Sequence, residues 1–133
     1  MARVIVLDAC VLIAHLASDD AHHERATRLL AGLAGQPKMM SVLTRAEVLV
    51  APARAGRLRA AEDVLDQLYI GTSELPCDAA GRLAELRAHS GLRMPDCCVL
   101  LTAEINGPAE LATFDERLAR AAAERGITVR AGS

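Results

Sequence analysis

The chain has 133 residues, which is enough for one domain with one sizeable core. Hydrophobic residues make up 52% of it and aromatic residues only 2%, so Leu, Val, Ile and Ala must build the core, and nucleic-acid binding by base stacking is disfavoured. The net charge of -2 argues against a generally basic, DNA-coating protein, although arginines could still form a local basic rim around an acidic centre. We expect a single domain over residues 1–133.

In chain order, short apolar runs alternate with helical patterns. The first half predicts a strand at 3–8, a helix at 9–17, a helix capped by Asp19 or Asp20 that continues to about Leu33, a turn at 35–38, a strand at 39–42 and a helix at 44–55. The second half predicts a helix at 57–70, a strand at 72–75, helices at 78–89 and 95–105, a strand at 110–113, a helix at 115–125 and a strand at 127–129. This alternation predicts a three-layer α/β/α sandwich with a mostly parallel central sheet.

The cysteines and the apolar segments bear on the compartment. Cys10, Cys77, Cys97 and Cys98 form no CxxC pair, which favours buried free thiols over disulfides or structural zinc. The N-terminus has no signal-peptide pattern, and no apolar stretch reaches the roughly 18 residues of a membrane span. These features predict a soluble, cytoplasmic protein.

Two acids follow predicted strands directly. Asp8 ends the first strand, and Asp115 follows the strand at 110–113. The carboxyl edge of an open parallel sheet is where ligands bind, because the loops part there and helix N-termini point into the gap. The competing interpretation is that each Asp caps the helix behind it. For Asp8 alone, cap and functional site are equally plausible.

Two further acids lie in the first turns of predicted helices. Glu47 matches the third position of a capping box with Thr44, so a structural role explains it well. Asp96 follows Pro95 at the start of the apolar helix at 95–105, where it could complement the helix dipole. A lone carboxylate beside so many apolar residues nevertheless needs a partner.

A joint interpretation explains all four acids better than four separate ones. Carboxylates gathered at one sheet edge repel each other unless protons or cations intervene. Oxygen ligands without histidine or cysteine favour Mg²⁺ or Mn²⁺ over Zn²⁺. Such ions activate water and stabilise leaving oxygens in phosphodiester hydrolysis. The expected metal-site and catalytic residues are Asp8, Glu47, Asp96 and Asp115.

Four motifs in order closely resemble the PIN-domain ribonucleases, and within them the VapC-type toxins of bacterial toxin-antitoxin pairs. The motifs are VLDACVLI at 6–13, TRAEV at 44–48, RMPDC at 93–97 and TFDERL at 113–118. The resemblance implies a Rossmann-like fold, Mg²⁺- or Mn²⁺-dependent cleavage of RNA, an inhibitory VapB-like antitoxin, operator DNA binding only through that antitoxin, and a homodimer. It also implies that the hydroxyl of Thr113 supports the last acid.

One position departs from the family pattern. The resemblance implies a hydroxyl residue just after the first Asp, where this chain has Ala9 and Cys10. Because a thiol is a weak donor, support for Asp8 could be poorer, and Thr113 becomes more important. Arg93 and Arg45 are candidate substrate-binding residues, with solvated or helix-end roles as their alternatives.

Other functions fit less well. Haloacid-dehalogenase phosphatases need an Asp-x-Asp pair, but position 10 is Cys10, and response-regulator receivers need a late lysine, whereas Lys38 is the only lysine. A catalytically silent interaction module with the same fold is the alternative to a nuclease. The helix stripe at Leu58, Leu65 and Leu68 could serve a dimer interface, although core burial explains such a stripe more simply.

Overall fold

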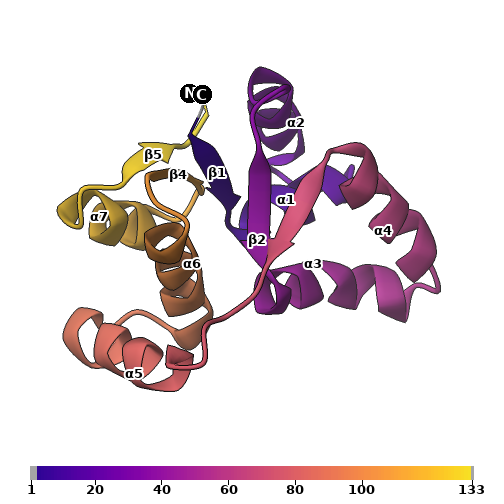
Figure 1. Cartoon of the computed structure of the whole chain (residues 1–133). Helices are drawn as coiled ribbons and strands as arrows, with labels where there is room; N and C mark the ends of the chain where they lie inside the picture. Colours follow the sequence, from indigo (N-terminus) through magenta and orange to yellow (C-terminus); the bar gives the residue numbers. More distant parts are fainter. Residues whose placement is uncertain (1–2, 133) are drawn as a thin grey trace.

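The computed structural model describes residues 3–132 and contains an all-parallel sheet with helices on both faces (Figure 1). Within these residues the sheet has five strands in the order β3-β2-β1-β4-β5. The strands are β1 (Val4–Leu7), β2 (Lys38–Ser41), β3 (Ile70–Ser73), β4 (Ala109–Ala112) and β5 (Thr128–Arg130). The helices are α1 (Ala9–Leu16), α2 (His23–Gly32), α3 (Val42–Arg54), α4 (Leu58–Gln67), α5 (Ala79–Ser90), α6 (Met94–Ile105) and α7 (Glu116–Glu124). The predicted three-layer sandwich is confirmed.

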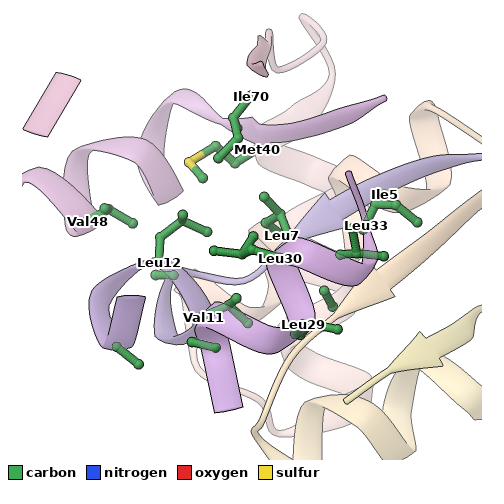
Figure 2. Packing of buried hydrophobic residues seen from close by; sticks show 14 of the residues in the cluster. Ile5, Leu7, Val11, Leu12, Leu29, Leu30, Leu33, Met40, Val48 and Ile70 are labelled. Carbon is green, nitrogen blue, oxygen red and sulfur yellow. The ribbon is translucent and has the colours of Figure 1, made fainter. Parts of the chain in front are cut away.

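Strand β1 explains how two hydrophobic cores form from one sheet. Its side chains alternate between the faces, so Ile5 and Leu7 enter one cluster while Val6 enters the other. The first cluster contains buried residues of α1 to α4, and Figure 2 shows several of their side chains around Leu7. The second contains buried residues of α5, α6 and α7. Because both faces are covered, the strand is a continuous apolar run, as its sequence predicts.

The strand order reverses direction at β1, and this reversal determines where a site can form. From β1 the chain crosses through α1 and α2 to β2 on one side, whereas α5 and α6 lead to β4 on the other side. Helices α1 and α7 therefore leave the adjacent strands β1 and β4 toward opposite faces of the sheet. The loops after these strands part at their carboxyl ends, which leaves a crevice at the switch point of an α/β sheet.

Several element boundaries differ from those predicted. Helix α4 ends at Gln67 instead of continuing to residue 70, and β3 begins at Ile70, two residues before the predicted strand. Tyr69 lies between them with a φ of 57°, a left-handed conformation that a helix cannot contain. The stripe at Leu58, Leu65 and Leu68 reaches only the C-cap of α4, so periodicity did not indicate the left-handed residue that follows. Helix α2 begins at His23, and Asp20 instead accepts a hydrogen bond from the His22 N–H before it.

Lys38 was predicted in a turn but is the first residue of β2, and it is buried. Its ammonium group donates hydrogen bonds to the carbonyls of Leu33 and Gln36, at 3.2 and 2.9 Å. These bonds offset the cost of removing the charge from water. The remaining strands are each shifted by about one residue from the prediction, within the usual uncertainty of element ends.

The predictions for helix burial and thiols have mixed outcomes. Helix α6 is buried along eight consecutive residues, as its apolar sequence predicted. All four cysteines are free, but only Cys97 and Cys98 are buried, while Cys10 is half-buried and Cys77 is exposed. Leu65 is fully buried and Leu58 is 42% exposed, so the stripe on α4 is mainly core.

Among residues 3–132, the helices are all too short or too polar to cross a membrane.

Candidate active site

Asp8 lies at the crevice between β1 and β4 and serves as the N-cap of α1. Its Oδ1 accepts a hydrogen bond of 2.8 Å from the backbone N–H of Ala9, which satisfies one of the free donors at the helix start. The side chain is only 8% exposed. Asp8 can therefore be a helix cap and a functional residue at once, because the capping carboxylate still lies at the switch point of the sheet.

Thr113 is the strongest side-chain partner of Asp8. Thr113 follows the end of β4 and is fully buried, and its hydroxyl donates a hydrogen bond of 2.7 Å to Oδ2 of Asp8. The same hydroxyl accepts the backbone N–H of Asp115 at 3.0 Å. Thr113 was predicted to support the last acid. Its hydroxyl contacts the backbone N–H of Asp115, and the hydrogen bond to the first acid was not predicted.

Cys10 also contacts the first acid, one residue into α1. Its thiol lies 3.3 Å from Oδ2 of Asp8 and 3.7 Å from the hydroxyl oxygen of Thr113, and it accepts the Phe114 N–H at 3.5 Å. Burial and the Asp8 charge raise the pKa of the Cys10 thiol to about 12, so the group is protonated at neutral pH. The thiol thus bridges two strand ends, a contact that the sequence did not predict.

Asp115 is the N-cap of α7, where its Oδ1 accepts the N–H of Leu118 at 3.0 Å. The preceding Phe114 is covered by side chains of the segment that begins α2. The Arg25 guanidinium lies 4.3 Å from the centre of the Phe114 ring, and the His22 ring lies 5.7 Å away. These contacts hold the turn that carries Asp115. No local sequence signal connects residue 25 with residue 114, so the contact could not be predicted.

Asp96 comes from the opposite helical layer, in the first turn of α6. Pro95 precedes it and suits this position because a helix N-terminus has N–H groups without intrahelical acceptors. Asp96 is 7% exposed, and Arg93 Nε lies 3.7 Å from its Oδ2. Burial raises the pKa of Asp96, and the charges of Asp8 and Asp115 raise it further, while Arg93 opposes them.

Glu47 lies on α3, but the predicted capping box with Thr44 is wrong. The helix begins at Val42, and its N-cap is Ser41, whose hydroxyl accepts the N–H of Thr44 at 3.1 Å. Glu47 is therefore one turn further along the helix, too far from its start to act as a cap. Burial raises the pKa of Glu47, followed by the charge of Asp8, and Asp96 also raises it. A capping box therefore does not explain why an acid stands at position 47.

The four acids form one electrostatic unit, defined here as the acidic centre: Asp8, Glu47, Asp96 and Asp115. Each raised pKa has the charge of another member among its causes. Across residues 3–132, however, no three His, Cys, Asp or Glu side chains are close enough together to hold a metal ion as they stand. The carboxylates thus share one region without forming a closed set of ligands.

The two predicted substrate-binding arginines differ in their environment. Arg93 is 75% exposed next to Asp96 and can reach a ligand in solvent. The Nη2 atom of Arg45 lies 3.3 Å from Oδ1 of Asp66, so a carboxylate of α4 already holds its guanidinium group. Of the two, Arg93 is the better placed to contact a phosphate near the acidic centre.

An apolar groove begins beside the acidic centre. It has a volume of about 510 Å³ and runs between α1, α3 and α4, with Glu47 in its wall. Its other lining includes Ile13, Leu16, Val50, Pro52, Ala61 and Val64. Ile13 is 40% and Val50 is 45% exposed, so the groove presents large apolar side chains to solvent. Such exposed apolar surface is typical of a binding site.

Comparison with known proteins agrees with this fold. A family model described as PIN domain matches residues 5–124. A toxin-antitoxin complex from Klebsiella pneumoniae is similar at 25% identity and a TM-score of 0.68, over 84% of this chain and 86% of that chain. No curated protein sequence matches.

Two further solved structures are similar in fold. The sarcin-ricin loop cleaving toxin VapC20 from Mycobacterium tuberculosis has 21% identity and a TM-score of 0.72, over 88% of this chain and 94% of that chain. VapBC2 from Rickettsia felis, bound to a DNA fragment from its promoter, has 16% identity and a TM-score of 0.70, over 98% of this chain and 99% of that chain.

Proposed function

The chain belongs to the PIN-domain family, and from this premise we propose that it is a metal-dependent endoribonuclease that acts as the toxin of a toxin-antitoxin pair. The observation that carries the proposal is the acidic centre. Four carboxylates from four separate segments lie around the switch point of the sheet, and two of them, Glu47 and Asp96, have pKa values raised by burial and then by the charge of Asp8.

The donor set fits Mg²⁺ or Mn²⁺. All four acids offer only oxygen, the donor that hard dications prefer. Neighbouring like charges, two of them on the buried residues Asp8 and Asp96, also need a counter-charge, and Arg93 is their one ion-pair partner in the described part of the chain. We assign Asp8, Asp96 and Asp115 to holding the ion, and Glu47 to holding it or orienting water. When bound, such an ion lowers the pKa of water and stabilises charge on the phosphate.

The protein's own groups position the reactants. Thr113 keeps Asp8 and the backbone of Asp115 in a fixed relation, so that two acids are oriented by one hydroxyl. Arg93 lies within reach of solvent beside Asp96 and is assigned to a substrate phosphate. With net charge -2, the protein attracts RNA by such local cations and not by its overall field.

The apolar groove supports an antitoxin as partner. Similar structures include toxin-antitoxin complexes from Klebsiella pneumoniae and Rickettsia felis. The groove here is mostly apolar, with Glu47 and Arg57 as the charged residues of its lining. It suits an antitoxin segment with apolar side chains and a basic residue near the acidic centre, where that residue would balance charge and block RNA. Operator DNA would then be bound through the antitoxin.

A homodimer is also part of this proposal. Val42, Leu43 and Met94 are exposed and offer apolar surface for it.

The test is cleavage of fluorescent RNA by purified, antitoxin-free protein, with Mg²⁺ or Mn²⁺ and with EDTA. We expect cleavage with metal, none with EDTA, and a loss of at least about 100-fold in Asp96→Asn, since a charged group of the site is removed. Absence of cleavage with either metal, or undiminished cleavage by Asp96→Asn, would favour the catalytically silent interaction module instead.

A further inference from the structure

We propose that Cys10 is a positioning residue of the acidic centre, which together with Thr113 holds one oxygen of Asp8 and leaves the other oxygen to face a divalent cation. The inference rests on the proposed function, because it concerns how the same site presents its first carboxylate. It adds a role for a thiol that no family motif supplies, since the resemblance implies a hydroxyl residue in this part of the chain.

The hydrogen bonds around Asp8 are unevenly divided between its two oxygens. Oδ2 accepts the Thr113 hydroxyl at 2.7 Å and the Cys10 thiol at 3.3 Å, whereas Oδ1 accepts the Ala9 N–H at 2.8 Å. A carboxylate oxygen has about two lone-pair sites. Two donors therefore occupy Oδ2, and one site on Oδ1 is left. Asp8 can present that site to a cation without giving up any of these bonds.

Cys10 also links two parts of the chain that carry different acids. Its sulfur accepts the N–H of Phe114, two residues before α7, while its thiol hydrogen points to Asp8 at the end of β1. The thiol thus acts as donor to one strand end and acceptor from the other. Serine can do both, whereas alanine and valine can do neither. This difference separates hydrogen bonding from packing as the function of the side chain.

Packing is the competing explanation, because Cys10 is half-buried and contacts the first hydrophobic cluster. A purely structural thiol would be replaced best by a residue of similar size and polarity. A positioning thiol would be replaced best by another group that donates and accepts. Cys10→Val tests the first possibility and Cys10→Ser the second, with Cys10→Ala removing both properties.

The experiment is calorimetric titration of Mn²⁺ into the wild type and these three variants. Loss of a residue that orients a metal ligand costs about 10- to 100-fold in metal affinity, so we expect a weakening of at least about 10-fold in Cys10→Ala and Cys10→Val. Cys10→Ser should stay within about threefold of the wild type. Val11→Ala is the matched control, because Val11 is a fully buried neighbour in the same helix, and alanine keeps the one hydrogen bond it makes to Asp8, from its backbone N–H to the Asp8 carbonyl. It should lose stability and keep its Mn²⁺ affinity.

A metal-free measurement tests the same contact. The S–H stretching band of Cys10 is identified by its loss in Cys10→Ser, and we expect its frequency to lie below that of the exposed Cys77 thiol because it donates to a carboxylate. Asp8→Ala should shift the band back to higher frequency. The infrared comparison between wild type and Cys10→Ser also decides the question should Cys10→Ala or Cys10→Val fail to fold.

The outcomes separate this inference from the proposed function. If the wild type binds Mn²⁺ and all three variants bind it equally, or if Cys10→Ser weakens binding as much as Cys10→Ala, the positioning role is overturned while the nuclease proposal stands. An unshifted S–H band in Asp8→Ala also overturns it. If the wild type itself binds no Mn²⁺ and cleaves no RNA, both proposals fail together.

Discussion

Two groups of charged residues in this molecule are arranged in opposite ways. Around Glu104, on α6, the carboxylate contacts Arg125 and lies 4.0 Å from Arg82, so one acid has two cations. The acidic centre includes Asp96 at the other end of the same helix, and its four acids are near one another. Within the described residues, the one ion pair that these four acids make is Asp96 with Arg93. The charge of Glu104 is balanced within the chain, whereas the acidic centre has an excess of negative charge.

This difference distinguishes a structural cluster from a functional one. An exposed ion pair contributes about 0 to 1 kcal/mol, so the Glu104 group stabilises the fold only slightly. Burying and gathering carboxylates reduces stability, and the pKa values of Glu47 and Asp96 are raised by burial first and by the charge of Asp8 second. On the proposed function, a divalent cation supplies the missing positive charge.

The largest expected effect is stabilisation of the acidic centre by its cation. At about 100 times the Kd, Mn²⁺ should raise the free energy of unfolding of the wild type by about 2.7 kcal/mol. Thermal unfolding with increasing Mn²⁺ measures this. Asp8→Asn should lose most of the Mn²⁺ response, whereas Glu104→Gln should keep it. An equal response in Asp8→Asn would place the bound ion elsewhere.

A smaller effect is expected from removing one charge without metal. In EDTA at pH 7, Asp96→Asn should be more stable than the wild type by on the order of 1 kcal/mol, because the cost of burying the charge and its repulsion by Asp8 and Asp115 are removed. Glu104→Gln should instead be less stable by about 0.5 kcal/mol, because an ion pair is lost. Chemical denaturation of both variants makes the comparison. Destabilisation of both to the same extent would mean that Asp96 is balanced like Glu104.

The smallest expected effect is a dependence of this difference on pH. A carboxyl group whose pKa is raised by folding binds its proton more tightly in the folded state, so the metal-free wild type gains stability as the pH falls through the raised pKa. The advantage of Asp96→Asn in EDTA should therefore shrink from pH 7 toward pH 5, above the ordinary carboxyl pKa of about 4. The Glu104→Gln difference should change little. Denaturation midpoints at each pH provide the measurement, and a constant Asp96→Asn advantage would contradict the shift.

The sequence predicted the fold class and the places where the acids lie. Apolar β-branched runs such as the one before Asp8 predict buried parallel strands, and parallel strands bring their carboxyl ends to one edge. Local pattern thus determined the topology well enough to group Asp8 with Asp115. Glu47 and Asp96 required the further knowledge of which helices cover which face, which the four motifs supplied by resemblance.

The features that sequence did not predict depend on long-range contacts or on one backbone angle. The Cys10 contact with Phe114 joins residues 104 positions apart, and the buried Lys38 is satisfied by carbonyls that a turn pattern does not reveal. The false capping box at Thr44 arose because Ser41, three residues earlier, offers the same chemistry. Tyr69 follows the C-cap of α4 with a φ of 57°, a backbone angle that the stripe through Leu68 did not indicate.

The order of the acids along the chain affects when the acidic centre can be complete during synthesis. Asp8, Glu47 and Asp96 are synthesised before Asp115, and β4, which fixes Thr113 next to Asp8, pairs with β1 on one side and β5 on the other. A nascent polypeptide that stops short of Thr113 cannot orient Asp8 through that hydroxyl. On the proposed function, cleavage of RNA therefore begins only after β4 and Thr113 have left the ribosome and paired with β1.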